Sequence, residues 1–311
     1  MGKQGKTGLK KRLLALAMLA AMLLSAMVFA PSAQAADGKG TDIVTKYPIV
    51  LVHGAGFRDI NVTINYWGRI PEHLESLGVK IYYGGTDGWC SVEQGAADLK
   101  AQIEKVLAET KSRKVNIIAH SKGGLEARYM ISSLGMAGKV ASLTTISTPH
   151  RGSVTVEDIL KAPDILVRAV SVFGDVFRFV WGDKHPDFYA GVQSLRPGDA
   201  EEFNKANPNK AGVYYQSFAG EMTEPADDFI LALPNYIVSD KEGPNDGMVT
   251  VESAKWGTFR GVLRGANGRG VSHADEADLR REDFEIEPIL GATTILDFYA
   301  ALTADLKKKG Y

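Results

Sequence analysis

Residues 114–124 read KVNIIAHSKGG, and this stretch decides the fold. Val115–Ala119 is a short, mostly apolar run that is typical of a buried strand, and a helix is predicted soon after it. Ser121 therefore lies where a strand passes directly into a helix. A serine on such a strained turn needs small residues two positions before and two after it, and Ala119 and Gly123 meet this requirement. The stretch predicts a nucleophilic serine, although a plain connection of serine and glycine would also fit.

Apolar runs and amphipathic stretches alternate around this motif. Strands are predicted over Tyr47–Val52, Val79–Tyr83, Val115–Ala119 and Val140–Ile146, and helices after Ser91, over Ala127–Leu134 and over Ile295–Leu306. Strands that alternate with helices favour a mostly parallel sheet with helices on both faces. The chain after residue 35 contains no internal repeat and no low-complexity linker, so residues 36–311 are expected to form one α/β domain.

A serine nucleophile needs a base, and the base needs an acid that orients it. On folds that carry such a serine turn, the chain order is serine, acid, histidine. Three of the six histidines follow Ser121, namely His150, His185 and His273. His273 lies in a loop far downstream, before the last predicted helix. By elimination we predict His273 as the base, with a surface loop histidine as the alternative interpretation.

The acid is expected between Ser121 and His273. Asp246 lies in GPNDGMV, residues 243–249, where Asn-Asp-Gly is turn chemistry. A tight turn explains these residues fully, but it would also hold an aspartate close to an imidazole. Asp246 is therefore the predicted acid, and Asp240 is the next choice.

An acyl-transfer site also needs two donors for the developing oxyanion. One is expected to be the backbone N–H of Lys122, the residue after the serine, at the start of a helix. The other is expected from the loop after the first strand, His53–Phe57. We predict the N–H of Ala55 as this second donor, with Phe57 as the alternative.

The first 35 residues have the pattern of a targeting segment. Basic residues between Lys3 and Arg12 precede an uncharged apolar run, Leu13–Ala30, and Ala33–Ala35 forms an A-x-A site. We predict a signal peptide over residues 1–35 and a secreted protein. An uncleaved membrane anchor is the alternative, because the apolar run approaches spanning length.

Residues 153–190 break the alternation of strands and helices. This stretch carries many large apolar side chains, among them Phe173, Phe177 and Trp181. We predict a helical lid whose apolar face covers the site and meets lipid when the lid opens. A buried helix of the core is the alternative.

Bulk properties exclude some functions. The formal net charge is −1, which gives no basic surplus to neutralise the phosphates of a nucleic acid. Cys90 is the single cysteine, so no intramolecular disulfide can form. No basic group flanks Cys90 in the sequence, and we interpret it as a packed thiol rather than a nucleophile.

At these motifs the chain resembles the secreted bacterial triacylglycerol lipases, especially the Gram-positive-type lipases and esterases of the α/β-hydrolase superfamily. The pieces that carry the resemblance are YPIVLVHG (47–54), INYWGRIP (64–71), KVNIIAHSKGG (114–124), STPHRGS (147–153), NDGMVTVESAKWG (245–257) and GVSHADEADLRR (270–281). They occur in order along nearly the whole chain after residue 35.

The resemblance implies an α/β-hydrolase fold with a lid and hydrolysis of carboxylic esters such as acylglycerols through an acyl-enzyme. It points to Ser121, Asp246 and His273 as the triad and to Ala55 and Lys122 as oxyanion donors. The implied partners are lipid or other ester substrates, with contact to lipid surfaces through the lid. A short-chain carboxylesterase and a polyester hydrolase are the alternatives on the same scaffold, and a binding protein without catalysis is a third.

The resemblance also raises the question of metals. Some related lipases bind calcium near the catalytic histidine, and some bind zinc near the lid. Asp275 lies where one calcium ligand is expected, but the other ligand positions do not align. No set of histidines and aspartates surrounds Trp89 for zinc. We therefore expect no cofactor and no metal, and leave a structural calcium ion at Asp275 open.

Overall fold

The computed structural model describes residues 42–56, 65–154, 156, 157, 183–228, 231, 235 and 243–311. The predicted signal peptide, the two alternative site residues Phe57 and Asp240, and most of the predicted lid lie outside the described residues. The strands are β1 (Ile49–Val52), β2 (Ile81–Tyr83), β3 (Val115–His120), β4 (Val140–Ile146), β5 (Tyr214–Gly220) and β6 (Thr258–Leu263). The α-helices are α2 (Ile70–Ser76), α3 (Val92–Thr110), α4 (Lys122–Ser132), α7 (Phe188–Gln193), α8 (Pro197–Ala206), α10 (Val251–Ala254) and α11 (Ile295–Lys308). Short 3-10 helices cover Met136–Lys139 (η2), Pro225–Asp227 (η3), Ala266–Gly268 (η4) and Asp275–Ala277 (η5).

The strands form one sheet in the order β2-β1-β3-β4-β5-β6, and every pairing is parallel. In the centre of the sheet, Val52 of β1 pairs with Ala119 of β3, and Ala119 pairs with Thr145 of β4. The carboxyl ends of β1, β3 and β4 therefore meet at one edge. The loops that leave these strands bring together residues far apart in the sequence, which is where open α/β sheets bind ligands.

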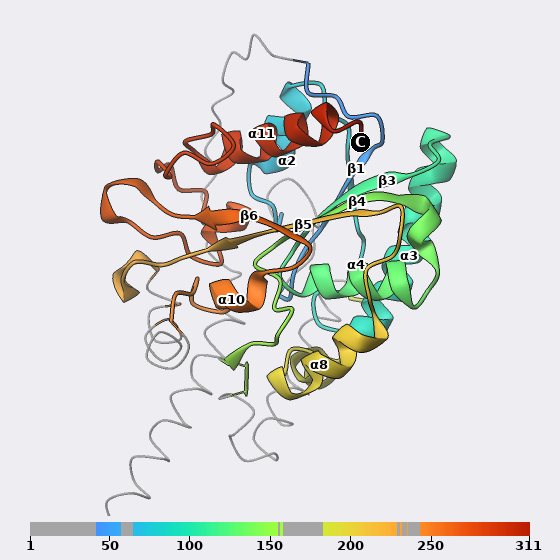
Figure 1. The fold of residues 1–311 in the computed structure, drawn as a ribbon, viewed down its shortest axis with the longest axis horizontal. Coiled ribbons are helices and arrows are strands. Elements are labelled where there is room, and N and C mark those ends of the chain that lie inside the picture. Colours follow the sequence, from blue (N-terminus) through green and yellow to red (C-terminus); the bar gives the residue numbers. More distant parts are fainter. Residues whose placement is uncertain are drawn as a thin grey trace, which may run out of the picture.

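Helices cover both faces of the sheet, with α2 and α11 on one side and α3 and α4 on the other (Figure 1). Successive residues of a strand point to opposite faces, so β1 contributes to two separate cores. Ile49 and Leu51 pack with α2 and α11, whereas Val50 and Val52 pack with α3 and α4. All four are completely buried, which explains why β1 is an unbroken apolar run rather than an alternating one.

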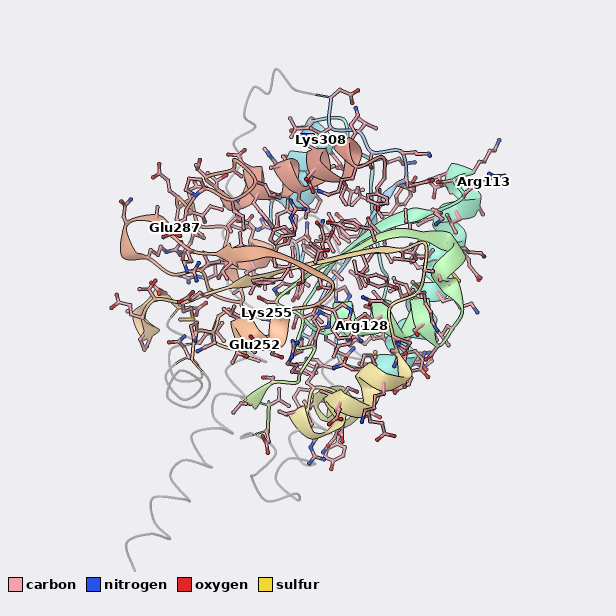
Figure 2. All side chains as sticks on the ribbon, viewed as in Figure 1. Arg113, Arg128, Glu252, Lys255, Glu287 and Lys308 are labelled. Carbon is pink, nitrogen blue, oxygen red and sulfur yellow. The ribbon has the colours of Figure 1, made fainter. Side chains whose placement is uncertain are left out.

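Charged side chains lie mainly at the periphery, but Arg128 of α4 is an exception. Figure 2 shows Arg113 and Glu287 at the rim of the molecule and Arg128 inside it. The Arg128 guanidinium lies 3.5 Å from the centre of the Trp256 ring and donates a hydrogen bond of 2.8 Å to Asn204 Oδ1 in α8. Arg128 thus adds a buried polar link between α4 and α8 to the stacking of Tyr129 on Phe203.

The expected α/β class and the parallel sheet flanked by helices are confirmed. The four predicted strands correspond to β1–β4, and Val140–Ile146 agrees at both ends. Helix α3 follows Ser91 as expected, and Ser91 is its N-cap, since Ser91 Oγ accepts a hydrogen bond from the Gln94 N–H at 3.2 Å. Among the described residues, no helix combines the length and the apolar character needed to cross a bilayer.

Candidate active site

Ser121 lies in a strained turn between β3 and α4. Its backbone has φ +53° and ψ −131°, a combination that L-residues rarely adopt. The turn is held in place because the Ser121 N–H donates to Ile146 O of the neighbouring strand at 3.0 Å. The side chain is 7% exposed, at the carboxyl edge of the sheet. The backbone thus has the geometry that a serine nucleophile on a sharp turn requires.

The predicted need for small residues around Ser121 has a physical basis in the structure. A Cβ added to Gly123 would lie 2.7 Å from Val52 O and closer still to His53 O. A Cβ added to Gly54 would lie 2.6 Å from the Cβ of Ser121. Both glycines therefore allow the loop after β1 to approach the serine turn more closely than any side chain would permit.

This close approach brings the two predicted oxyanion donors to the same place. Ala55 follows Gly54, which packs on Ser121, and the next residue is fixed because the Gly56 N–H donates to Gly88 O at 3.2 Å. Lys122 is the first residue of α4, where backbone N–H groups have no partner within the helix. Both backbone segments thus border the serine turn, as an oxyanion hole requires.

The side chain of Lys122 points away from this role and into the core. It is 1% exposed and forms an ion pair with Glu126, which is equally buried, and its Nζ lies 3.6 Å from Cys90 Sγ. Burial opposes the Lys122 ammonium, but the Glu126 carboxylate outweighs it and raises the pKa of the lysine. Burial raises the pKa of the Cys90 thiol to about 12, so this cysteine stays protonated, in line with a packed thiol.

Asp246 and His273 are in direct contact, as the sequence predicts. His273 Nδ1 lies 2.7 Å from Asp246 Oδ2, and the His273 N–H donates to Asp246 O at 2.9 Å. The other carboxylate oxygen, Oδ1, accepts the N–H groups of Met248 and Val249 at 2.8 and 2.7 Å. Asp246 is completely buried, so these bonds fix the carboxylate and leave one oxygen for the imidazole.

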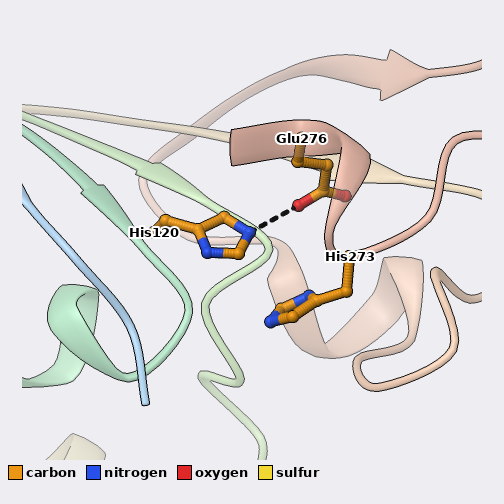
Figure 3. Close-up of side chains that lie close together, drawn as sticks. All are labelled: His120, His273 and Glu276. Atoms are coloured by element: carbon orange, nitrogen blue, oxygen red, sulfur yellow. Dashed lines mark hydrogen bonds and ion pairs between the residues drawn. The ribbon is translucent and has the colours of Figure 1, made fainter. Parts of the chain in front are cut away.

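A second group of buried polar residues lies next to this pair and was not predicted from the sequence. The rings of His120 and His273 are 4.4 Å apart between centroids, and His120 Nε2 lies 3.0 Å from Glu276 Oε2 (Figure 3). Tyr66 Oη lies 2.7 Å from His120 Nδ1, and Ser147 Oγ donates to Glu276 Oε1 at 2.7 Å. The sequence did offer one signal for this group. His120 directly precedes Ser121 at the end of a buried strand, so its side chain was a candidate for burial.

Burial decides the charge states of this group. Burial lowers the pKa of His120 well below its ordinary value, and the neighbouring His273 adds to the effect. Burial and the charge of Asp246 raise the pKa of Glu276 well above its ordinary value. A neutral imidazole has one donor and one acceptor nitrogen, so of Tyr66 Oη and Glu276 Oε2 one donates to the His120 ring and the other accepts from it.

His150, another of the histidines that follow Ser121 in the sequence, lies apart from the Asp246–His273 pair. His150 follows β4 but its ring nitrogens are engaged by Arg128 Nη1 and Thr145 Oγ1, both at 3.1 Å, and its ring stacks on Trp256. It therefore packs on the side of the sheet that carries α4 and α8, apart from the Asp246–His273 pair.

The same contacts decide whether this region can hold a metal ion. Ligand atoms of His120, His273 and Glu276 lie within 4.8 Å of one another, but both ring nitrogens of His120 and both carboxylate oxygens of Glu276 already have hydrogen-bond partners. Asp275 is the residue at which a structural calcium ion was left open, and its oxygens lie 3.6 Å from Arg269 Nη2 and 3.8 Å from Arg280 Nη1. Burial raises the pKa of Asp275 to about 6 against the opposing effect of these guanidiniums. Two cations thus already face the carboxylate, so its surroundings do not fit a calcium ion.

Comparison with known proteins gives a consistent result. Residues 48–192 match the family model described as palmitoyl protein thioesterase. Triacylglycerol lipase 2 of Saccharomyces cerevisiae is 30% identical over 262 residues, which cover 80% of this chain and 75% of that protein. The triacylglycerol lipase of Vibrio cholerae is 29% identical over 83% of this chain and 88% of its own. That of Burkholderia plantarii is 35% identical, over 59% of this chain and 53% of its own.

Solved structures agree on the fold. The metagenomic carboxyl esterase MGS0156 is similar with a TM-score of 0.64 at 18% identity, over 94% of this chain and 90% of its own. The mature lipase BlEst2 of Bacillus licheniformis is similar with a TM-score of 0.55 at 20% identity, over 79% of this chain and 89% of its own. At these identities the similarity establishes a shared fold, and the chemistry has to be argued from the site.

Proposed function

Because the chain belongs to the triacylglycerol lipase family and is a carboxylic ester hydrolase with the α/β-hydrolase fold, we propose that Ser121, His273 and Asp246 are its catalytic triad and that it cleaves acylglycerol esters. The observation that carries the proposal is the 2.7 Å contact of His273 Nδ1 with a fully buried Asp246, on the same sheet edge as the strained Ser121 turn. The order of the three residues along the chain also fits.

The geometry assigns a role to each group. With its Nδ1–H bound to Asp246, His273 has Nε2 free to accept the proton of Ser121 as the hydroxyl attacks the ester carbonyl. The oxyanion is bound by the backbone N–H groups of Ala55 and Lys122. His273 then returns the proton to the leaving alcohol, and water repeats the sequence on the acyl-enzyme to release the acid.

The position of Lys122 supports this assignment. Its side chain is held in the core by Glu126, so the first turn of α4 is anchored and its N–H groups have a fixed direction. A fixed donor loses no energy to reorientation when the oxyanion forms, which is the source of its catalytic effect. The Lys122–Glu126 ion pair therefore positions the oxyanion donor without contacting the substrate.

We also propose that the protein is exported and that residues 153–190 form a lid. The basic and apolar residues of the segment 1–35 support export. The large apolar side chains of the segment 153–190 support contact with lipid surfaces. Both proposals rest on sequence pattern.

The test is hydrolysis of chromogenic esters of short to long acyl chains, with a palmitoyl thioester included because of the family model that residues 48–192 match. Ser121→Ala should lower kcat by about a million-fold, the scale seen for serine nucleophiles of this kind. The matched control is Ser76→Ala, which removes an exposed hydroxyl of α2 and should keep wild-type turnover.

Each outcome decides a separate point. Near-normal turnover of folded Ser121→Ala would exclude this serine as the nucleophile. A rate that rises with chain length supports the acylglycerol substrate, whereas activity confined to short chains would make the protein a short-chain carboxylesterase. Preference for the thioester would move the substrate class to acyl thioesters.

A further inference from the structure

Two buried carboxylates lie behind the loop that carries His273. Asp228 and Asp275 are 3% and 2% exposed. Both bind Ser272, the residue before His273, because Ser272 Oγ donates to Asp228 Oδ2 at 2.9 Å and the Ser272 N–H donates to Asp275 Oδ2 at 3.1 Å. The conformation of the histidine loop therefore depends on two acidic groups whose burial is costly unless a cation compensates them.

Arg280 is a cation that approaches both carboxylates. Its Nη1 lies 3.4 Å from Asp228 Oδ2 and 3.8 Å from Asp275 Oδ1, and it donates a hydrogen bond of 2.7 Å to Asp227 O. On its outer side the guanidinium is held by Glu282, whose Oε1 accepts from Nη2 at 2.6 Å. One planar group thus joins the Asp227–Asp228 segment to the histidine loop and is itself fixed in direction.

We propose that the Arg280 guanidinium is an internal cation that positions His273, at the place where the resemblance to calcium-binding lipases left one calcium ligand open. Arg280 acts through Asp228, Asp275 and Ser272 and does not touch the reacting atoms, so it is a positioning residue. The proposal rests on the role of His273 in the proposed function. It also predicts that the protein works without a divalent cation.

The position of one oxygen supports this assignment. Within the described part of the chain, Asp275 Oδ1 is buried and has no hydrogen-bond partner, and it is the oxygen that faces Arg280 Nη1. Its compensation is therefore electrostatic. A calcium ion bound to Asp275 Oδ1 and Asp228 Oδ2 would place its two charges against the guanidinium, and like charges at contact repel.

The same geometry gives a direct test. Without the guanidinium, Asp228 Oδ2, Asp275 Oδ1 and Asp227 O would remain as a cluster of buried oxygen atoms. Carboxylate and carbonyl oxygens are the ligands that calcium prefers. Arg280→Ala should therefore turn a calcium-independent protein into a calcium-dependent one. Arg264→Ala is the matched control, because Arg264 forms a partly exposed ion pair with Glu221.

The first readout is the melting temperature, measured in the Ser121→Ala background so that it does not depend on catalysis. The Ser121→Ala protein that retains Arg280 should have the same melting temperature in chelator and in calcium chloride. Arg280→Ala should melt several degrees lower in chelator and recover with calcium, but not with potassium chloride at matched ionic strength. Arg280→Lys, which keeps a cation of shorter reach, should lie between the two and serves if the alanine variant does not fold.

The second readout is ester hydrolysis with an active Ser121. Arg280→Ala in chelator should lose about 10–100-fold in kcat, the usual scale for groups that orient a functional side chain, with a small change in KM, and calcium should restore it. The proposal is overturned if chelator inactivates the wild type, if Arg280→Ala behaves like Arg264→Ala, or if calcium fails to raise the melting temperature of Arg280→Ala. If calcium restores the melting temperature while Ser121→Ala hydrolyses esters normally, the internal cation stands and the catalytic proposal falls.

Discussion

The two halves of the site are held by different forces. Ser121 is positioned by a strained backbone, by a backbone hydrogen bond to Ile146 of β4 and by glycines that let the end of β1 approach the turn. His273 is positioned by buried polar side chains that come from far away. Asp246 is 27 residues before it, and Glu276 reaches back across 156 residues to His120 and 129 to Ser147. Steric requirements are local and tolerate no added atom, whereas the polar half depends on pairing.

The largest effect that separates the two halves is expected from Asp246→Asn. An amide of the same shape keeps the packing, but its NH2 group cannot accept the His273 Nδ1–H, so the imidazole loses its orientation and its compensating charge. By analogy with the corresponding change in other serine hydrolases, kcat should fall by about 10⁴-fold with little change in melting temperature. Steady-state kinetics on a soluble short-chain ester measure this. Asp199→Asn in exposed α8 is the control, and a loss below tenfold would remove Asp246 from the triad.

Gly123→Ala probes the steric half and should have the next largest effect. The added methyl group would overlap His53 O and lie 2.7 Å from Val52 O, both backbone atoms at the end of β1. The turn must therefore shift, which costs about 1–3 kcal/mol of stability. A shift near 1 Å at the oxyanion donors costs about 100-fold in kcat.

The matched control is Gly138→Ala, because a Cβ at Gly138 has no atom within 4 Å. It should leave both the free energy of unfolding and kcat close to wild type. Equal behaviour of the two variants, measured by urea unfolding and by ester turnover, would mean that the close approach of β1 to the serine turn is not required.

The same contrast explains what the sequence predicts and what it does not. The central strands are buried on both faces, so they are apolar runs that are easy to recognise. β5 and β6 were not predicted. In β5, Gln216 and Ser217 are buried polar residues: Gln216 Nε2 donates a hydrogen bond to Thr144 Oγ1, and Ser217 Oγ accepts one from the Trp256 N–H. In the sequence alone, these polar residues are typical of a loop, because their hydrogen-bond partners come from other parts of the chain.

The helix after Ser121 shows a second limit. Its start was placed too late, because glycines weaken a helix prediction. In the structure α4 begins at Lys122, and Gly124 is required there because an added Cβ would lie 2.8 Å from Thr148 Cβ and closer to its Oγ1. A packing requirement from another element overrides the local preference.

Within the site, Ser121, Asp246 and His273 were predicted because chain order and turn chemistry restrict the choice. Glu276 and Arg280 could not be predicted, because a lone glutamate or arginine has no pattern and its role arises from the groups that fold against it. For Asp275 the sequence left a calcium ion open and gave no sign of Arg269 and Arg280, which face its carboxylate from 6 residues before it and 5 after it.

The smallest effect is expected where the two halves touch, at His120. Its pKa is lowered in the folded protein, so the imidazole stays neutral there while the unfolded chain titrates near 6.5. Its contribution to stability is therefore full above about pH 6.5 and is lost as the pH falls toward the folded-state pKa, by at most about 1.4 kcal/mol per pH unit. His120→Gln supplies an amide donor and an amide acceptor to Tyr66 and Glu276 but cannot titrate, so the melting temperature should fall less steeply with acidification.

Some dependence of the melting temperature on pH should remain in this variant, because burial also lowers the pKa of His150. His185→Gln removes an exposed imidazole and should keep the wild-type slope. If His120→Gln shows the same slope of melting temperature against pH as the wild type, His120 is not held neutral by the fold.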